Sequence, residues 1–246
     1  MTNTTHRNQF LALRSRRLAE ATREFLARGK SVIRCEDCQL AAYACICQWR
    51  PTLKTRSEFI LLMHRDEVLK PTNTGRLIAD VLPAHTHVFC WSRTEPDDEL
   101  VKLLNDSQRR CVIVFPEEAN EAATNSRELV SALPMDEQIN TFVLLDGTWK
   151  QSGRMFHLSR WLDVFPCVVL PDADGRGYAV RKSHQDNYLS TAEAAALCLR
   201  TANEPTASEV LLDYFQLFNL HYLATRACVP PETGELHARL ATLIGK

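Results

Sequence analysis

Four cysteines lie within 13 residues and form a dense group of metal-binding side chains. They are Cys35, Cys38, Cys45 and Cys47, with the spacing C-x2-C-x6-C-x-C. Thiolates at this spacing let a short loop wrap one tetrahedral zinc ion, which would be structural because no ligand position stays open. An iron–sulfur cluster uses the same ligands and is the alternative. The segment has too few apolar residues for a core of its own, which argues against four unliganded thiols.

Asp146 is a candidate for proton transfer. It closes the apolar run TFVLLD and precedes Gly147, Thr148 and Trp149. A carboxylate at the end of a strand, beside a flexible glycine and an aromatic ring, can accept a proton from a stacked base. An aspartate that caps the following helix is the commoner explanation of the same pattern. Both roles stay open from the residues alone.

Two further segments open helices with residues that can bind anions. Ser190, Thr191 and Glu193 follow the pattern of a capping box, and the helix N-terminus that it creates suits a ligand carboxylate. Arg76, in the segment 73–76, could hold a carboxylate or phosphate through two hydrogen bonds, or could lie on the surface. The glycine patterns of P-loop ATPases and Rossmann dinucleotide sites are not indicated.

Alternating apolar runs and amphipathic stretches supply the elements that must position these groups. Strands are predicted at 59–63, 87–91, 111–115, 141–146 and 167–171. Helices are expected at 74–82, 97–105, 147–157, 191–203, 207–225 and 232–244. This alternation indicates an α/β fold, a parallel sheet with helices on both faces. Ligands bind at the carboxyl ends of such strands, where His64, Trp91 and Asp146 fall.

A basic helix is predicted at 8–29, with an apolar stripe through Leu11, Leu18 and Phe25. Residues 1–56 hold 11 basic and 4 acidic residues, a net charge of +7, whereas the remaining 190 residues carry −8. We therefore expect a basic zinc module at 1–56 and an α/β domain at 57–246. The charge pattern is typical of nucleic-acid binding, although a solvated basic helix produces it equally well.

Size and composition place the chain among ordinary globular proteins. Of its 246 residues, 45% are apolar and 24% charged, which excludes disordered, collagen-like and coiled-coil classes. No apolar run reaches the roughly 20 residues that cross a bilayer, and the N-terminal residues lack the apolar core of a signal peptide. We expect a cytoplasmic protein with no membrane partner, whose other five cysteines are mostly buried thiols.

Taken together, these segments resemble the DTW-domain family. The family signature matches residues 146–149 within LDGTWKQSGRM. The cysteine cluster, KPTNTGRLIADVLP, WSRTEP, FPEEA and YLSTAEAAA agree with the family in order and spacing. The resemblance covers residues 8–225 and is strongest to the bacterial tRNA-uridine aminocarboxypropyltransferases of this family. The stretch after 225 matches no motif.

This resemblance implies a SPOUT-like fold, an α/β knot that holds S-adenosylmethionine; periodicity alone does not show a knot. It makes Asp146 the general base in a transfer of the 3-amino-3-carboxypropyl group to a tRNA uridine, within a catalytic domain at 57–246. The implied cofactor pocket consists of Phe115, Pro116, Glu117, Leu144, Leu145, Gly147, Thr148, Trp149, Leu189, Ser190 and Thr191. The implied substrate contacts are Asn73, Thr74, Gly75, Arg76, Arg93 and Arg181.

The implied partner is tRNA, held by its phosphates through the zinc module and the arginine-rich helix. Two other functions stay open. One is a SPOUT-class RNA methyltransferase, which would use the same cofactor but transfer a different carbon. The other is a zinc-bearing RNA-binding protein without catalysis. We expect a monomer, although SPOUT relatives are often dimers.

Overall fold

The computed structural model describes residues 8–22, 31–116, 127–170 and 189–245. Within these ranges, six parallel strands form one sheet in the order β2-β1-β5-β3-β6-β4. The strands are β1 (Glu58–Met63), β2 (Thr86–Cys90), β3 (Arg109–Val114), β4 (Leu129–Val130), β5 (Ile139–Asp146) and β6 (Cys167–Val168). The predicted parallel sheet is confirmed. The sequence did not predict β4, and β6 ends earlier than expected, because each has only two paired residues.

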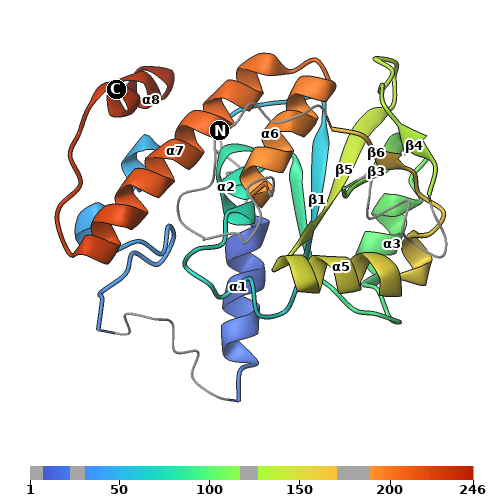
Figure 1. Ribbon diagram of the computed structural model, residues 1–246, viewed down its shortest axis with the longest axis horizontal. Coiled ribbons are helices and arrows are strands. Elements are labelled where there is room, and N and C mark those ends of the chain that lie inside the picture. Colours follow the sequence, from blue (N-terminus) through green and yellow to red (C-terminus); the bar gives the residue numbers. More distant parts are fainter. Residues whose placement is uncertain (1–7, 23–30, 117–126, 171–188, 246) are drawn as a thin grey trace, which may run out of the picture.

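Helices cover both faces of the sheet (Figure 1). The first face carries α1 (Gln9–Ala19), α2 (Gly75–Val81), α6 (Thr191–Thr201) and α7 (Pro205–Ala227). The second face carries α3 (Asp98–Leu104) and α5 (Trp149–Leu158). Alternate strand residues serve the two faces: Phe59 and Leu61 lie in the first core, and Ile60 and Leu62 lie in the second. Every strand buried on both sides explains the continuous apolar runs.

Helix α1 differs from the basic helix predicted at 8–29. Asn8 caps its start by accepting hydrogen bonds from the N–H groups of residues 10 and 11, and Glu20 is its C-cap. The buried face is formed by Phe10 and Leu13 and packs beside β2, whereas Leu18 is 41% exposed. The stripe predicted through Leu18 is therefore wrong, because only the first turns of the helix reach the core. Phe25 lies outside the described residues.

The four-cysteine loop, residues 35–47, packs beneath α7 (Figure 1). It contains the 3₁₀ turn η1 (Ala42–Ala44) and leads into η2 (Cys47–Trp49). His221 of α7 contacts the Ala44 carbonyl through Nδ1 at 2.9 Å. Its Nε2 lies 2.9 Å from Nε2 of His237 on α8 (Glu235–Leu243), so the last helix is tied to α7 and the loop together. None of the described helices combines the length and apolarity needed to cross a membrane.

Candidate functional site

Asp146 is the last residue of β5, and it is only 3% exposed. Met63, the last residue of the neighbouring strand β1, is its partner in the register. One carboxylate oxygen, Oδ2, accepts a hydrogen bond from Nδ2 of Asn73 at 2.8 Å. The other, Oδ1, accepts from the hydroxyl of Thr191 at 3.1 Å. Three segments that are distant in the sequence therefore meet on one buried carboxylate.

Asn73 and Gly75 lie at the start of α2 and form one wall of this site. Asn73 is buried, and its Oδ1 accepts the backbone N–H of Arg76 at 3.1 Å, so both ends of its amide are used. A Cβ atom on residue 75 would lie 2.1 Å from Oδ2 of Asp146. Only glycine allows the backbone to approach the carboxylate this closely. Thr74, also buried, is the N-cap residue of α2.

Thr191 is the first residue of α6 and forms the opposite wall. The capping box predicted at this helix is confirmed: the Ser190 hydroxyl accepts the N–H of Glu193, and the Glu193 carboxylate accepts the N–H of Ser190. Burial raises the pKa of Glu193. The cap holds the first turn of α6 in place, and the positive end of the helix dipole points at the space beside Asp146.

Helix α5 begins three residues after Asp146, and its N-cap is Thr148. The Thr148 hydroxyl accepts the N–H of Gln151 at 3.4 Å, while Oε1 of Gln151 accepts the N–H of Thr148 at 2.8 Å. The helix-cap explanation of Asp146 is therefore wrong. Its carboxylate is bonded to Asn73 and Thr191 instead, which leaves it in the site and not in the helix.

The remaining residues of the implied cofactor pocket lie in different settings. Leu144 and Leu145 point into the two cores, so only their backbones can face a ligand. Trp149 is 40% exposed in the first turn of α5. Phe115 stacks on Phe156 of α5, with ring centroids 4.1 Å apart. Gly147, Pro116 and Leu189 are half-buried, and Glu117 lies outside the described residues.

The implied substrate contacts do not form one group. Arg76 is 1% exposed, and its guanidinium lies 4.9 Å from the Phe218 ring and donates to the Asp37 carbonyl at 3.3 Å. It therefore points from α2 toward the four-cysteine loop. Arg93 is exposed beyond the end of β2, where its carbonyl accepts Nε1–H of Trp161 at 3.3 Å. Arg181 lies outside the described residues.

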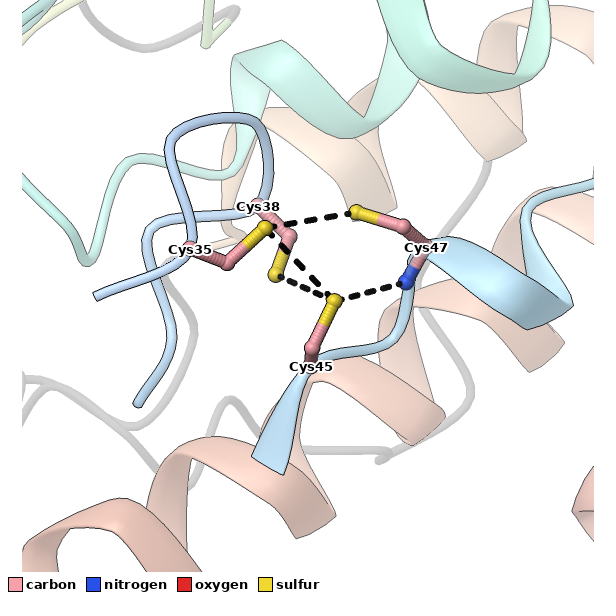
Figure 2. Close-up of side chains that lie close together, drawn as sticks. All are labelled: Cys35, Cys38, Cys45 and Cys47. Carbon is pink, nitrogen blue, oxygen red and sulfur yellow. Dashed lines mark hydrogen bonds between the residues drawn. The ribbon is translucent and has the colours of Figure 1, made fainter. Parts of the chain in front are cut away.

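The four cysteine thiols converge on one point (Figure 2). The sulfur of Cys35 lies 3.7 Å from that of Cys47 and 3.5 Å from that of Cys45, and Cys38 and Cys45 are 3.8 Å apart. Zinc bound to four thiolates at about 2.3 Å would space the sulfurs about 3.8 Å apart. The cluster therefore fits a single tetrahedral ion. An iron–sulfur cluster distributes its thiolates over several irons and needs a wider cage.

Ionisation of these thiols also suits a cation. The hydrogen bond with Cys47 lowers the pKa of Cys38 to about 4 against the opposing effect of burial. The same interaction raises the pKa of Cys47, and burial raises that of Cys45 to about 11. Four thiols packed this closely cannot all ionise unless a positive charge neutralises them. A metal ion supplies that charge.

Residues 32–223 match the DTW domain, which is more than half of the chain. The chain belongs to the DTW domain family. Three curated relatives share the name tRNA-uridine aminocarboxypropyltransferase 2. The Mus musculus protein is 27% identical over 170 residues, which is 67% of this chain and 55% of that protein. The Macaca fascicularis protein is 26% identical over 170 residues, with the same two coverages. The Drosophila melanogaster protein is 25% identical over 174 residues, 68% of this chain and 65% of its own length.

The chain thus spans less than two thirds of the length of these relatives. No solved structure matches it. The DTW domain contains both the four-cysteine loop and the Asp146 site, whereas α1 and α8 lie outside the matched residues.

Sequence reasoning missed one residue of the DTW domain that joins its two sites. Arg50 donates from Nη2 to the sulfur of Cys47 at 3.2 Å, and its Nε lies 3.6 Å from Oδ1 of Asp80 in α2. Asp80 is buried, and burial raises its pKa against the effect of Arg50. The only available signal was an arginine placed three residues after the last cysteine, which is also a common surface pattern.

Proposed function

We propose that this DTW-domain protein transfers the 3-amino-3-carboxypropyl group of S-adenosylmethionine to N3 of a uridine in the tRNA variable loop, releasing 5′-methylthioadenosine. The observation that carries the proposal is the buried Asp146 carboxylate, which Asn73 and Thr191 hold at the carboxyl end of a central strand. Ligands of α/β sheets bind at this edge. The names of the relatives support the same reaction class.

The donor is proposed to bind beside Asp146, in the loops after β3 and β5 and at the start of α6. Its sulfonium and ammonium groups are cationic and suit the Asp146 carboxylate, while its carboxylate suits the N-terminus of α6. Gly75 and Gly147 keep side chains out of this space on two sides. A SPOUT-like knotted path of the chain around this pocket is part of the proposal.

Bound S-adenosylmethionine supplies an electrophilic γ-carbon attached to its sulfonium. Asp146 takes the proton from uridine N3, and the N3 electron pair forms the new bond to that carbon. The electron pair of the broken carbon–sulfur bond stays on sulfur, which becomes a neutral thioether. Asn73 and Thr191 fix the orientation of the carboxylate through one hydrogen bond to each oxygen. Only the carbon aligned with N3 reacts, so positioning selects the γ-carbon over the methyl group.

The two halves of the chain are proposed to divide the work. Residues 1–56, with zinc in the four-cysteine site, hold the tRNA, and residues 57–246 carry the reaction. Arg16 is exposed on α1 and would contact phosphates, which position an RNA without reading its sequence. Trp149 presents an exposed ring next to Asp146 and would stack on the target uracil.

The test is one incubation of purified protein with unmodified tRNA and S-adenosylmethionine, followed by mass spectrometry of the digested nucleosides and the small by-product. Aminocarboxypropyluridine together with methylthioadenosine is the expected result. A methylated nucleoside with S-adenosylhomocysteine would keep the cofactor and replace the reaction with methyl transfer. Bound tRNA without any product would favour an RNA-binding protein without catalysis.

A further inference from the structure

A basic and aromatic groove lies at the far end of α5 from Asp146. It has a volume of about 400 Å³ and is lined by Arg93, Thr94, His157, Leu158, Arg160 and Trp161. We call it the Trp161 groove. Its lining includes two guanidinium groups and one imidazole, and no lining residue carries a carboxylate. The groove therefore combines a surface for anions with an aromatic ring.

Hydrogen bonds between two loops hold the walls of the groove in place. Nε1–H of Trp161 donates to the Arg93 carbonyl at 3.3 Å. Two residues earlier in each loop, Nε1–H of Trp91 donates to the Ser159 hydroxyl at 2.8 Å, and Ser159 donates in turn to the Met155 carbonyl at 2.6 Å. Both tryptophans also pack on the second core. The ring of Trp161 is thus pre-positioned, which lowers the entropy lost when a ligand binds.

The groove connects to the Asp146 site along the edge of the sheet. β2 is two strands from β5, so the loop of Arg93 leaves the sheet about 10 Å from Asp146. Between them His64, which follows β1, lies against Trp91 with ring centroids 6.3 Å apart and an interplanar angle of 22°. Helix α5 runs from beside Asp146 toward the groove (Figure 1), and its ten residues span about 15 Å. This is the range of a neighbouring nucleotide.

We infer that the Trp161 groove binds a nucleotide that flanks the target uridine. The inference rests on the proposed function, which places the uridine beside Asp146. A base stacks on Trp161, and the guanidinium groups of Arg93 and Arg160 bind the adjoining phosphate. Stacking tolerates any base, so the groove sets the distance and direction of the strand and does not read its sequence. Two anchored points, Asp146 and the groove, then present the uridine in one orientation.

The experiment measures tRNA affinity and steady-state kinetics for Arg93→Gln combined with Arg160→Gln, and separately for Trp161→Leu and Trp161→Phe. The double arginine variant is expected to weaken tRNA binding about tenfold and to reduce the slope of log affinity against log salt by about 1 to 2. Trp161→Leu should raise KM for tRNA about tenfold while kcat at saturating tRNA stays within twofold. Trp161→Phe keeps an aromatic ring and should restore most of the affinity.

Arg239→Gln on α8 is the matched control, because it also removes one arginine and breaks only an exposed ion pair with Asp213. It should leave affinity and salt slope unchanged. If the arginine variant behaves like this control, the groove does not bind RNA and the inference is overturned. Equal losses in Trp161→Leu and Trp161→Phe would reject stacking. The binding measurements are independent of turnover, so a wild-type protein that binds tRNA without modifying it would overturn the proposed function and leave the groove open to the same test.

Discussion

The four-cysteine loop and the Asp146 site are built in opposite ways. The loop draws its ligands from 13 consecutive residues, and a few turns bring them together. The Asp146 site combines Asn73, Asp146 and Thr191, which span 119 residues and meet only because β5 lies in the middle of the sheet. A local cluster needs an ion to hold it together, whereas a site assembled by the sheet is held by the core.

The two regions are nevertheless in mechanical contact. Arg50 reaches from the Cys47 sulfur toward Asp80, and Asp80 lies in the same short helix that begins at Gly75. Arg76, in that helix as well, donates to the Asp37 carbonyl within the loop. A change at the cysteines can therefore move the start of α2 against Asp146. The comparison predicts large effects on stability at the loop and large effects on turnover at Asp146.

The largest expected effect is the loss of the metal. Cys38→Ser should release the ion and lower the free energy of unfolding by on the order of 4 kcal/mol, as expected when a structural metal is lost. Cys228→Ser, at an exposed free cysteine, is the control and should change neither quantity. Metal content and urea unfolding measure both. A Cys38→Ser protein that keeps one ion per chain would show that the loop is not the metal site.

Asp146→Asn should reduce kcat about 1,000-fold, because an amide cannot accept the N3 proton. Its stability should fall by only about 1 kcal/mol, since one of two hydrogen bonds is lost. Binding of tRNA should stay within a few fold of the wild-type value. The measurement pairs initial rates with thermal unfolding and a tRNA titration. Activity that survives this change would remove Asp146 from the role of base.

Gly75→Ala tests how closely α2 must approach the carboxylate. The added Cβ would lie 2.1 Å from Oδ2 of Asp146, so the carboxylate must move. A displacement near 1 Å is expected to lower kcat about 100-fold without loss of metal. Gly153→Ala, in the exposed part of α5 where a Cβ meets no atom within 4 Å, is the matched control and should stabilise the helix by roughly 0.5–1 kcal/mol. Equal activity in the two variants would contradict the geometry.

The smallest effect concerns Glu58, a carboxylate with two donors at the opposite end of β1. Burial acts to raise its pKa, but hydrogen bonds with His87 and Arg109 outweigh burial and lower it. A depressed pKa stabilises the fold above the ordinary value and is lost as the pH falls below it. Wild-type stability should therefore drop from pH 5 to pH 3 by about 1 kcal/mol more than that of Glu58→Gln. Unfolding midpoints across this range test it, and turnover at pH 7 should be unchanged.

The strands, the capping box at Ser190 and the cysteine cluster could all be predicted, because each depends on residues close together in the sequence. The partners of Asp146 could not be derived from local pattern, since an aspartate after a strand reads most simply as a helix cap. Residue types also hid Arg76, whose charge suggests a surface and whose side chain lies in the core. The Trp161 groove joins the loops at 91–93 and 157–161, which no spacing in the sequence relates.

The place of β5 in the sheet also has a consequence for folding. β1 pairs with β5 through Phe59 and Phe142, 83 residues apart, and β3 waits for the same strand on its other side. Long-range parallel pairing closes large loops and forms slowly. At a synthesis rate of about 5–20 residues per second, β1 leaves the ribosome roughly 4–17 s before its partner. During that interval its inner edge is open to wrong partners, so the arrival of the strand that carries Asp146 both completes the sheet and protects it.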